Sequence, residues 1–331
     1  MRHSFVLNLP HPGPYPDPLP NRVLACGSIV KISVCIATYR RPDRLAALLD
    51  DLVHQELLPD EVVVVDNDAD GSARAVVEHR RAEGCPFPLT YEIQPERNIA
   101  LTRNRTVHLA RAEWLAFVDD DERAPRAWLR QLLEAAERFG ADGILAPVEP
   151  RVPESAPAWI RRGRFYEWPR LPSGTPVPQH NLRFGNVLLR GAPLRAEPGP
   201  FDVSFGLSTG EDGDLLMRLI AKGARIIWSD EAIVDEPVEA KRLSLRWLLN
   251  RAYSGGQHFA RLSIHGRYQL VNAVSRWMMF VRWLAQAIVA LGLAAVSLPA
   301  GRHRAAAWLI KAWANLGKLS AFYGRRYNEY A

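Results

Sequence analysis

Short apolar segments alternate with segments of helical periodicity from residue 31 onward, and this alternation limits the possible folds more than any other feature. The apolar segments are rich in β-branched side chains, and the continuous run at 61–65 is typical of a strand buried on both faces. We predict strands at 32–37, 61–65, 89–93 and 114–118, and helices at 43–53, 72–82, 99–111 and 211–222. Strands and helices that alternate at this spacing predict βαβ units and an open parallel sheet.

Polar side chains follow three of the predicted strands, at the point where each strand ends. They are Thr38 and Tyr39 after the first strand, Asp66, Asn67 and Asp68 after the second, and Asp119, Asp120 and Asp121 after the fourth. Ligands of open α/β sheets bind beyond the carboxyl ends of the strands. The sequence therefore predicts one ligand site at this edge of the sheet.

The three consecutive acids at 119–121 favour a bound cation. Carboxylates this close repel one another, which raises the pKa of at least one of them. Mg²⁺ or Mn²⁺ removes the repulsion by binding one or two carboxylates together with the phosphate oxygens of a substrate. The alternative is a solvated acidic turn that leads into a helix beginning near Glu122 and Pro125.

The polar residues that follow the first two strands also allow two interpretations. Asp66 and Asn67 can contact a nucleobase or a ribose, or they can form an Asx turn. The ring of Tyr39 can stack on a base, and the guanidinium group of Arg41 can bind phosphate. These residue types therefore fit a nucleotide, although each cluster alone is a weak signal.

Two further pairs lie on predicted helices. Arg103 and Asn104 can face phosphate groups, although an arginine on a helix usually contacts solvent. Glu211 and Asp212 begin the helix at 211–222, where the helix dipole favours acids whatever their role. In the functional interpretation, this second pair supplies a general base that takes a proton from an attacking hydroxyl.

Five segments occur in an order that resembles a known family. The segments are 32–40, 64–67, 100–105, 117–121 and 210–215. Over about residues 31–250 the chain resembles the family 2 glycosyltransferases of the GT-A fold, notably bacterial enzymes of surface and exopolysaccharide assembly, including the succinoglycan type. The resemblance implies an α/β fold with a mixed, mostly parallel sheet flanked by helices.

The resemblance also implies roles on the donor side of the site. Thr38 and Tyr39 would line the nucleotide pocket, with Asp66 or Asn67 facing the base. Asp119–Asp121 matches the DxD-type motif: Asp121 would bind the Mg²⁺ or Mn²⁺, with Asp119 as a second candidate ligand, and Asp119 or Asp120 would hold the ribose or the sugar. No histidine follows the last expected strand, at 232–236, so the resemblance assigns no histidine ligand.

On the acceptor side, the resemblance implies that Asp212 is the catalytic base and that Glu211 orients it or the acceptor. Gly185 and Asn186 would line the acceptor side. The implied reaction is an inverting, metal-dependent transfer from a nucleotide-diphospho-sugar, with UDP as the expected nucleotide. The acceptor would be a hydroxyl of a lipid-linked or polysaccharide substrate in cell-surface polysaccharide biosynthesis.

Two other functions remain as alternatives. A sugar nucleotidyltransferase also uses an α/β sheet and metal-binding acids, but it would be expected to carry a glycine-rich phosphate loop, whereas residues 38–42 contain no glycine. A non-catalytic, membrane-tethered scaffold with a GT-A fold would need neither Asp121 nor Asp212, which are both present.

Charge is distributed unevenly along the chain. Residues 241–331 contain fourteen Lys or Arg and a single acid, so the first 240 residues carry a net charge of −7 although the whole chain carries +6. A basic segment dense in Trp, Leu and Ala favours an anionic membrane surface over nucleic acid. The expected location is the cytoplasmic face of the bacterial inner membrane, with peripheral or hairpin anchoring.

Two apolar segments near the C-terminus allow three arrangements. Residues 277–298 would form a helix of about 33 Å, long enough to cross a bilayer, and residues 305–323 form a second apolar segment. The pair can form a hairpin or an interfacial pair, the first can be a membrane span, or both can cap the catalytic domain. The expected domains are a flexible Pro-rich extension at 1–30, a catalytic domain at 31–250 and a membrane-associating helical region at 251–331.

Overall fold

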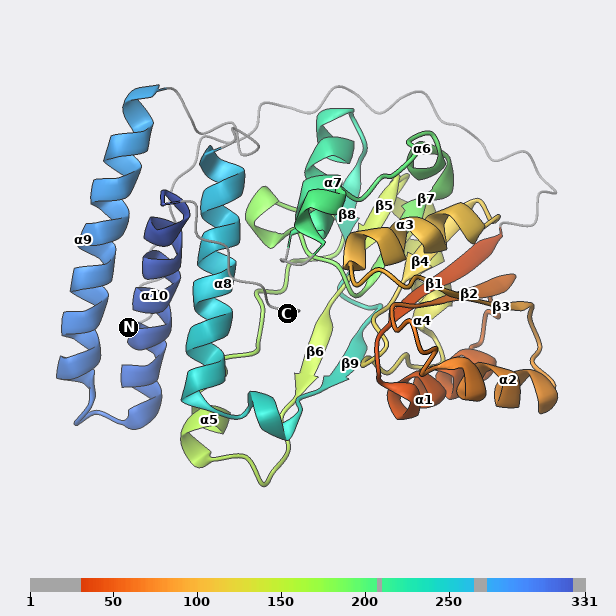
Figure 1. The fold of residues 1–331 in the computed structure, drawn as a ribbon, viewed down its shortest axis with the longest axis horizontal. Helices are drawn as coiled ribbons and strands as arrows, with labels where there is room; N and C mark the ends of the chain where they lie inside the picture. The colour runs from red at the N-terminus through yellow and green to blue at the C-terminus, as the bar shows by residue number, and fades with distance from the viewer. Residues whose placement is uncertain (1–30, 207–209, 265–272, 324–331) are drawn as a thin grey trace. The chain divides into compact units, whose positions relative to one another are not determined.

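The computed structural model describes residues 31–206, 210–264 and 273–323, so the extension expected at 1–30 lies outside the described residues. A seven-stranded sheet organises the fold (Figure 1). Its strand order is β3 (Leu89–Ile93), β2 (Glu61–Asp66), β1 (Ile32–Thr38), β4 (Trp114–Phe117), β7 (Val187–Arg190), β5 (Gly143–Leu145) and β8 (Ile226–Trp228).

The sheet is mixed and mostly parallel. Strands β3, β2, β1 and β4 pair in parallel, and β7 runs antiparallel between β4 and β5. The four strands predicted from the apolar runs are confirmed. Residues 147–200, expected to form loops and short strands, also supply β7, a central strand of the sheet, whose first three residues are buried.

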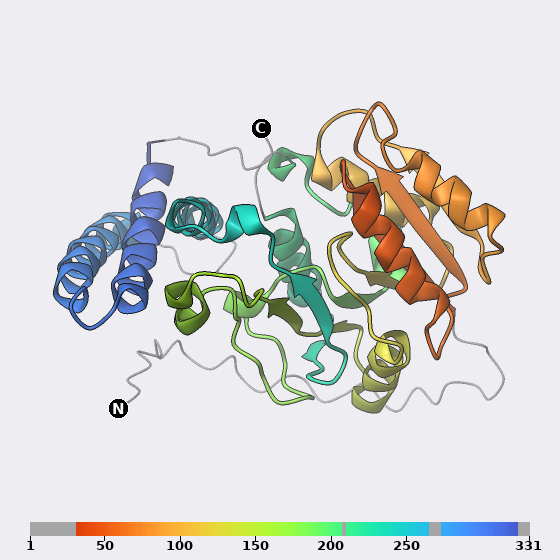
Figure 2. The ribbon, with the colours of Figure 1, turned by 90° about the horizontal axis from the view of Figure 1, so that it is seen from below.

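Helices cover both faces of the sheet, which explains why its strands are apolar on both sides (Figure 2). Helices α1 (Pro42–Val53), α2 (Arg74–Ala82) and α4 (Trp128–Phe139) lie on one face, and α3 (Ile99–Leu109) and α7 (Glu211–Ala221) lie on the other. In α1, the leucines at 45, 48, 49 and 52 follow helical spacing and are fully buried. Helices were predicted at α1, α2, α3 and α7, and all four are confirmed.

A two-stranded parallel sheet lies beside the main one. It pairs β6 (Val148–Arg151) with β9 (Val234–Pro237). The short helices are α5 (Ala158–Gly163), η1 (Gln179–Asn181), α6 (Gly191–Arg195), η2 (Val203–Phe205) and η3 (Ala240–Arg242). Since η3 follows β9 directly, this small sheet sets the position of the acids and the arginine at 236–242.

Three long helices follow: α8 (Leu245–Ile264), α9 (Ala273–Ser297) and α10 (Arg302–Ala321). They lie side by side with α10 in the middle, as Figures 1 and 2 both show. Ala260 of α8, Trp283 of α9 and Leu319 of α10 form the centre of their shared core. The helices expected at 277–298 and 305–323 are thus confirmed, and α8 runs through the domain boundary expected at residue 250.

Glycines allow α8 and α10 to cross with their backbones in contact. A Cβ atom at Gly256 would lie 2.0 Å from the carbonyl oxygen of Ala314, and one at Gly317 would lie 2.1 Å from that of Tyr253. Neither position can hold a larger side chain without separating the helices. The crossing therefore depends on glycine at both positions.

Replacing Gly256 with alanine should destabilise the protein by about 3 kcal/mol, the upper end of the usual cost of overpacking, because the added methyl group meets backbone atoms. The neighbouring Gly255 faces open space, so Gly255→Ala should instead stabilise α8 by about 0.5–1 kcal/mol. Urea denaturation of both variants measures the difference. Equal effects of the two substitutions would contradict the close crossing.

Candidate active site

The ends of β1 and β4 meet through the acidic triplet. The Thr38 hydroxyl at the end of β1 donates a hydrogen bond of 2.8 Å to Asp120. Nη1 of Arg41 donates to Asp120 at 2.9 Å and to Asp121 at 3.0 Å. The structure therefore brings these two polar clusters together at one edge of the sheet, as the sequence predicts.

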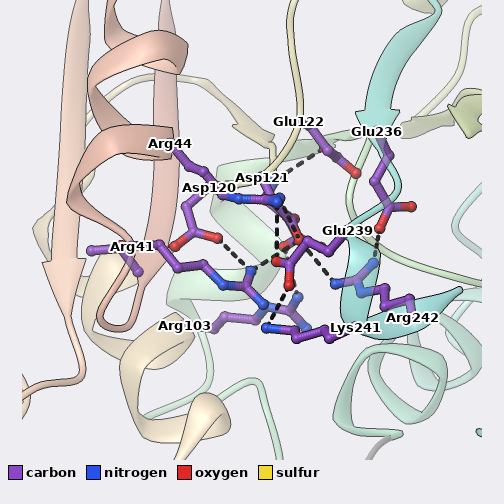
Figure 3. Close-up of polar contacts among 12 residues, drawn as sticks. Arg41, Arg44, Arg103, Asp120, Asp121, Glu122, Glu236, Glu239, Lys241 and Arg242 are labelled. Atoms are coloured by element: carbon purple, nitrogen blue, oxygen red, sulfur yellow. Dashed lines mark hydrogen bonds and ion pairs between the residues drawn. The ribbon is translucent and has the colours of Figure 1, made fainter. Parts of the chain in front are cut away.

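Three guanidinium groups surround the Asp121 carboxylate, whose side chain is only 7% exposed (Figure 3). Arg41 and Arg242 each donate to Oδ2 at 3.0 Å, and Nη1 of Arg44 lies 3.6 Å from the same oxygen. Arg242 also pairs with Glu236, and Arg44 pairs with Glu239 at 3.1 Å. Positive groups from the start of α1 and from η3 thus surround an acid that lies four residues after β4.

Arg103 of α3 joins the acidic triplet to the start of α7. Its Nη1 lies 2.6 Å from Oε1 of Glu211, and its Nη2 lies 3.2 Å from Oδ1 of Asp119. Its guanidinium carbon lies 4.9 Å from the centre of the Phe184 ring, which packs against the group. One buried arginine therefore bridges residues that are far apart in the sequence.

Burial raises the pKa values of several of these acids. The pKa of Asp120 rises to about 6, mainly because water is excluded from it, although Arg41 opposes the rise. Burial raises the pKa of Glu211 to about 7 in spite of the Arg103 charge, and it raises that of Glu122 well above its usual value. Several carboxyl groups at this edge of the sheet are thus poorly solvated and have raised pKa values. Such clusters are typical of ligand sites.

The turn before α7 buries Glu211 and leaves Asp212 half-buried. Gly210 has φ +123°, which other residues rarely adopt, and the Glu211 carboxylate accepts the Gly210 N–H at 3.0 Å. Asp212 is half-buried, and its Oδ1 accepts the N–H of Gly213 at 2.7 Å. Glu211 is therefore fixed inside the protein, while Asp212 keeps part of its surface exposed.

The polar cluster after β2 holds its own loop together. The fully buried Asp66 accepts the N–H groups of Asp68 and Ala73 and the Tyr91 hydroxyl. The Asn67 amide donates to the carbonyls of Gln94 and Glu96, and its oxygen accepts the N–H of Asn98. Both side chains are engaged within the protein, so a contact of either with a base stays a prediction.

Two arginines lie near the ring of Tyr39. The guanidinium carbons of Arg40 and Arg97 lie 5.3 and 4.9 Å from the centre of its ring. Its position, directly after β1 and next to Thr38, is the one that the sequence indicated. The arginines hold the ring at the same edge as the acids.

Two predicted asparagines instead support the fold. Asn104 exchanges two hydrogen bonds of 2.8 Å with the backbone of Phe201. Asn186, 2% exposed, accepts the indole N–H of Trp128 and donates to the carbonyls of Pro147 and Ala232. Their side-chain groups are thus engaged within the protein, and a contact of Asn104 with the donor stays a prediction.

Gly185 has a clearer relation to the site than its neighbour Asn186. A Cβ atom there would lie 2.6 Å from Oε1 of Glu122 and 3.5 Å from Oδ2 of Asp119, and its φ is +110°. Glycine therefore lets the backbone before β7 approach the acids closely. The predicted role of Gly185 and Asn186 on the acceptor side stays a prediction.

Sequence reasoning missed several members of the site. Arg44, Glu236, Glu239 and Arg242 all contact the triplet or its arginines. A helix face that begins with Pro42 could have indicated Arg44, since it lies one turn after Arg41. No local pattern indicates the other three, which reach the triplet only through the pairing of β9 with β6.

The pattern of the family described as "Glycosyl transferase family 2" matches residues 33–189. The succinoglycan biosynthesis protein ExoM of Rhizobium meliloti (strain 1021) is 38% identical over 265 residues, which cover 77% of this chain and 81% of that protein. This chain belongs to glycosyl transferase family 2. The galactofuranosyltransferase GlfT1 of Mycolicibacterium smegmatis (strain ATCC 700084 / mc(2)155) is 34% identical over 58% of this chain and 66% of its own length.

Solved structures of other glycosyltransferases share the fold of this glycosyltransferase. The mannosyltransferase PcManGT from Pyrobaculum calidifontis, solved with GDP-Man and Mn²⁺, gives a TM-score of 0.61 at 18% identity and covers 89% of this chain and 88% of its own. TarS 1–349 from S. aureus, solved with UDP, gives 0.51 at 20% identity over 90% and 93%. The sheet described above is thus the GT-A fold.

The acids of this glycosyltransferase fit a hard divalent cation that takes only part of its ligands from the protein. Asp119 and Asp121 offer the carboxylate oxygens that Mg²⁺ and Mn²⁺ prefer. Within residues 31–206, 210–264 and 273–323, no group of three or more His, Cys, Asp or Glu side chains could hold a metal ion. The residues therefore fit a cation that takes one or two carboxylates and completes its coordination with phosphate oxygens and water.

Replacing Asn186 with alanine should lower the free energy of unfolding by about 2 kcal/mol or more. The change leaves the Trp128 indole N–H and the Ala232 carbonyl without the Asn186 side chain, while the Pro147 carbonyl keeps the N–H of Val234. Each buried group left unpaired costs about 1–3 kcal/mol. Urea denaturation measures the loss, with the exposed Asn250→Ala of α8 as control, expected to shift it by less than about 0.5 kcal/mol. A similarly small shift for Asn186→Ala would contradict the structural role.

Proposed function

We propose that this glycosyltransferase moves a sugar, with inversion, from a nucleotide-diphospho-sugar to a hydroxyl of a lipid-linked or polysaccharide acceptor in cell-surface polysaccharide biosynthesis. The succinoglycan relative supports the polysaccharide product. The observation that carries the proposal is the Arg103 bridge, because it brings the acidic triplet and the Glu211–Asp212 pair to one place. A donor on the triplet and an acceptor on Asp212 would then meet there.

On the donor side, the guanidinium groups of Arg41, Arg44 and Arg242 suit a diphosphate. An arginine presents several donors in a fixed plane and keeps its charge at any physiological pH. The Tyr39 ring and the Thr38 side chain suit the nucleoside, with Asp120 on the ribose and Asp66 or Asn67 near the base. UDP is the nucleotide that we expect.

Asp121 and Asp119 would hold the Mg²⁺ or Mn²⁺. Such an ion, when bound, offsets the negative charge that develops on the departing nucleoside diphosphate. The arginines around Asp121 act in the same direction, because they place fixed positive charge where that leaving group separates. The chain thus provides part of this stabilisation through its own side chains.

On the acceptor side, Asp212 takes the proton of the attacking hydroxyl. Its partial exposure suits this task. The hydroxyl oxygen then attacks the anomeric carbon on the face opposite the leaving group, which inverts the configuration as the nucleoside diphosphate departs. Glu211, held by Arg103 and by the Gly210 N–H, fixes the turn that carries the base. The backbone at Gly185 and Asn186 forms part of the acceptor side.

Replacing Asp212 with asparagine should lower the rate of transfer by about 10²–10⁴-fold, the usual contribution of a general base. The affinity for UDP should change little, since Asp212 makes no contact with the donor in this mechanism. Sugar transfer from a panel of nucleotide sugars, with Mg²⁺ or Mn²⁺ added, and UDP binding by calorimetry measure the two effects.

The exposed Asp50→Asn of α1 is the matched control and should transfer at the rate of the unmodified protein. Near-normal turnover by Asp212→Asn would show that another group is the base. Donor binding without transfer or donor hydrolysis, in the unmodified protein, would favour the non-catalytic scaffold.

Helix α9 supports a membrane location. Arg276–Ser297 is long and apolar enough to cross a membrane, yet only 22% of that window is buried. Its inner face, with Trp283, Ala287, Ala290 and Ala294, packs inward. Its outer face exposes large apolar side chains, including Met278, Val281, Leu284, Ile288, Val289 and Val296.

The packing of α9 favours an orientation in the plane of the membrane surface. Helix α10 packs along α9 and carries the exposed Arg302, Arg304 and Lys311, so a crossing α9 would draw charges toward the bilayer interior. We therefore propose that the outer face of α9 lies on the cytoplasmic face of the bacterial inner membrane. The basic region at 241–331 would bind its anionic lipids.

Replacing Ile288 with glutamate should weaken binding to anionic vesicles about tenfold or more, because burial of one such side chain contributes about 1.5–3 kcal/mol. Ile288 is 62% exposed, so the fold should tolerate the change. Flotation with phosphatidylglycerol vesicles measures the binding, and Leu58→Glu, at an exposed apolar side chain far from α9 in sequence, is the control.

Unchanged flotation of Ile288→Glu would remove the outer face of α9 from the membrane contact. Orientation has its own test, with single cysteines placed by Trp277→Cys and Leu298→Cys in a chain whose native cysteines are serine. A membrane-impermeant maleimide should reach both from the same side of the membrane. Labelling from opposite sides would establish a crossing helix instead.

A further inference from the structure

Helix α8 places a histidine against the turn that carries Asp212. The ring of His258 packs on Gly210 so closely that a Cβ atom at Gly210 would lie 1.7 Å from its Cε1 and 2.0 Å from its Nδ1. Phe205 of η2 meets the same ring edge to face, with centres 6.2 Å apart. The imidazole therefore fills the space that glycine leaves at the start of α7.

Glu211 and Asp212 are flanked by glycines that face this ring. A Cβ atom at Gly213 would lie 3.8 Å from Nε2 of His258, an ordinary contact, whereas Gly210 has no room for any side chain. The turn is thus held from two directions. Arg103 binds Glu211 from the sheet side, and His258 packs on Gly210 from α8.

The ring keeps a polar atom that the fold does not use. Nδ1 of His258 is buried and has no hydrogen-bond partner among the residues that the structure describes. Burial lowers the pKa of His258, although the neighbouring charges of Asp212 and Asp214 oppose this and those of Arg261 and Arg251 add to it. An unpaired buried polar group costs about 1–3 kcal/mol, so an apolar side chain of similar size would make a more stable contact.

We propose that His258 is a positioning residue for Asp212, which it fixes from α8 through its contact with the Gly210 turn and through a ring nitrogen that remains available to the carboxylate. This inference rests on the proposed role of Asp212 as the base. It assigns a part in the reaction to a helix outside the family match at 33–189. A base displaced by about 1 Å can lose about 10²-fold in rate, so such a contact has a measurable effect.

The test compares two substitutions in the full-length protein. His258→Leu keeps the apolar contact and removes the nitrogen, so the melting temperature should hold or rise while kcat for transfer falls about 10–100-fold. His258→Asn keeps a polar atom near the place of Nδ1 and should recover most of kcat. The affinity for UDP and the KM for the donor should stay unchanged in both, and Gly255→Ala, on the exposed side of α8, should transfer normally.

Three results would overturn the inference. One is a normal kcat for His258→Leu. Another is a kcat that falls in proportion to the melting temperature in both variants, which is the result expected of a purely structural residue. The third is an absence of transfer by the unmodified protein with every nucleotide sugar, which would overturn the proposed function as well. Normal transfer by the unmodified protein and by His258→Leu would overturn only the role of His258.

Discussion

The site depends on the pairing of buried carboxylates with arginines. Asp120, Asp121 and Glu211 are each at most 7% exposed, and ionised acids in such places are costly unless a positive group compensates. Arg41, Arg103 and Arg242 provide that compensation, from the residue before α1, from α3 and from η3. Removing Arg41 would leave Asp120 without its arginine, and removing Arg103 would do the same to Glu211, so the positions of these elements and of the acids depend on one another.

Close approach of the backbone is the second requirement, and glycine satisfies it at two places. Gly185 lets the segment before β7 approach Glu122 and Asp119, and Gly210 lets α8 meet the first turn of α7. Both glycines have a positive φ and no room for a Cβ atom, so the backbone conformation and the packing each require glycine there. The acids and the turn with Asp212 can therefore lie at one edge of the sheet without intervening side chains.

Local patterns in the sequence predicted the individual strands and helices whose formation depends on neighbouring residues. The continuous valines at 62–65 and the leucines of α1 identify a buried strand and an amphipathic helix whatever surrounds them. The insertion of β7 between β4 and β5, and the contacts of Arg242 with Asp121 and of His258 with Gly210, depend on segments that meet only in the folded chain. Asn186 has a second function that no local pattern indicates, since its side chain binds Trp128 and two carbonyls from separate segments.

Helix α8 connects two regions that the sequence analysis treated as separate domains. Its His258 contacts the turn of Asp212, while its Gly256 crosses α10, which packs in turn on α9. A rigid helix transmits a displacement at one position to the others, and close-packed interfaces resist gradual deformation. The surface that we place on the membrane and the base that we place at the acceptor therefore belong to one continuous set of packed helices, from α9 through α10 and α8 to the first turn of α7.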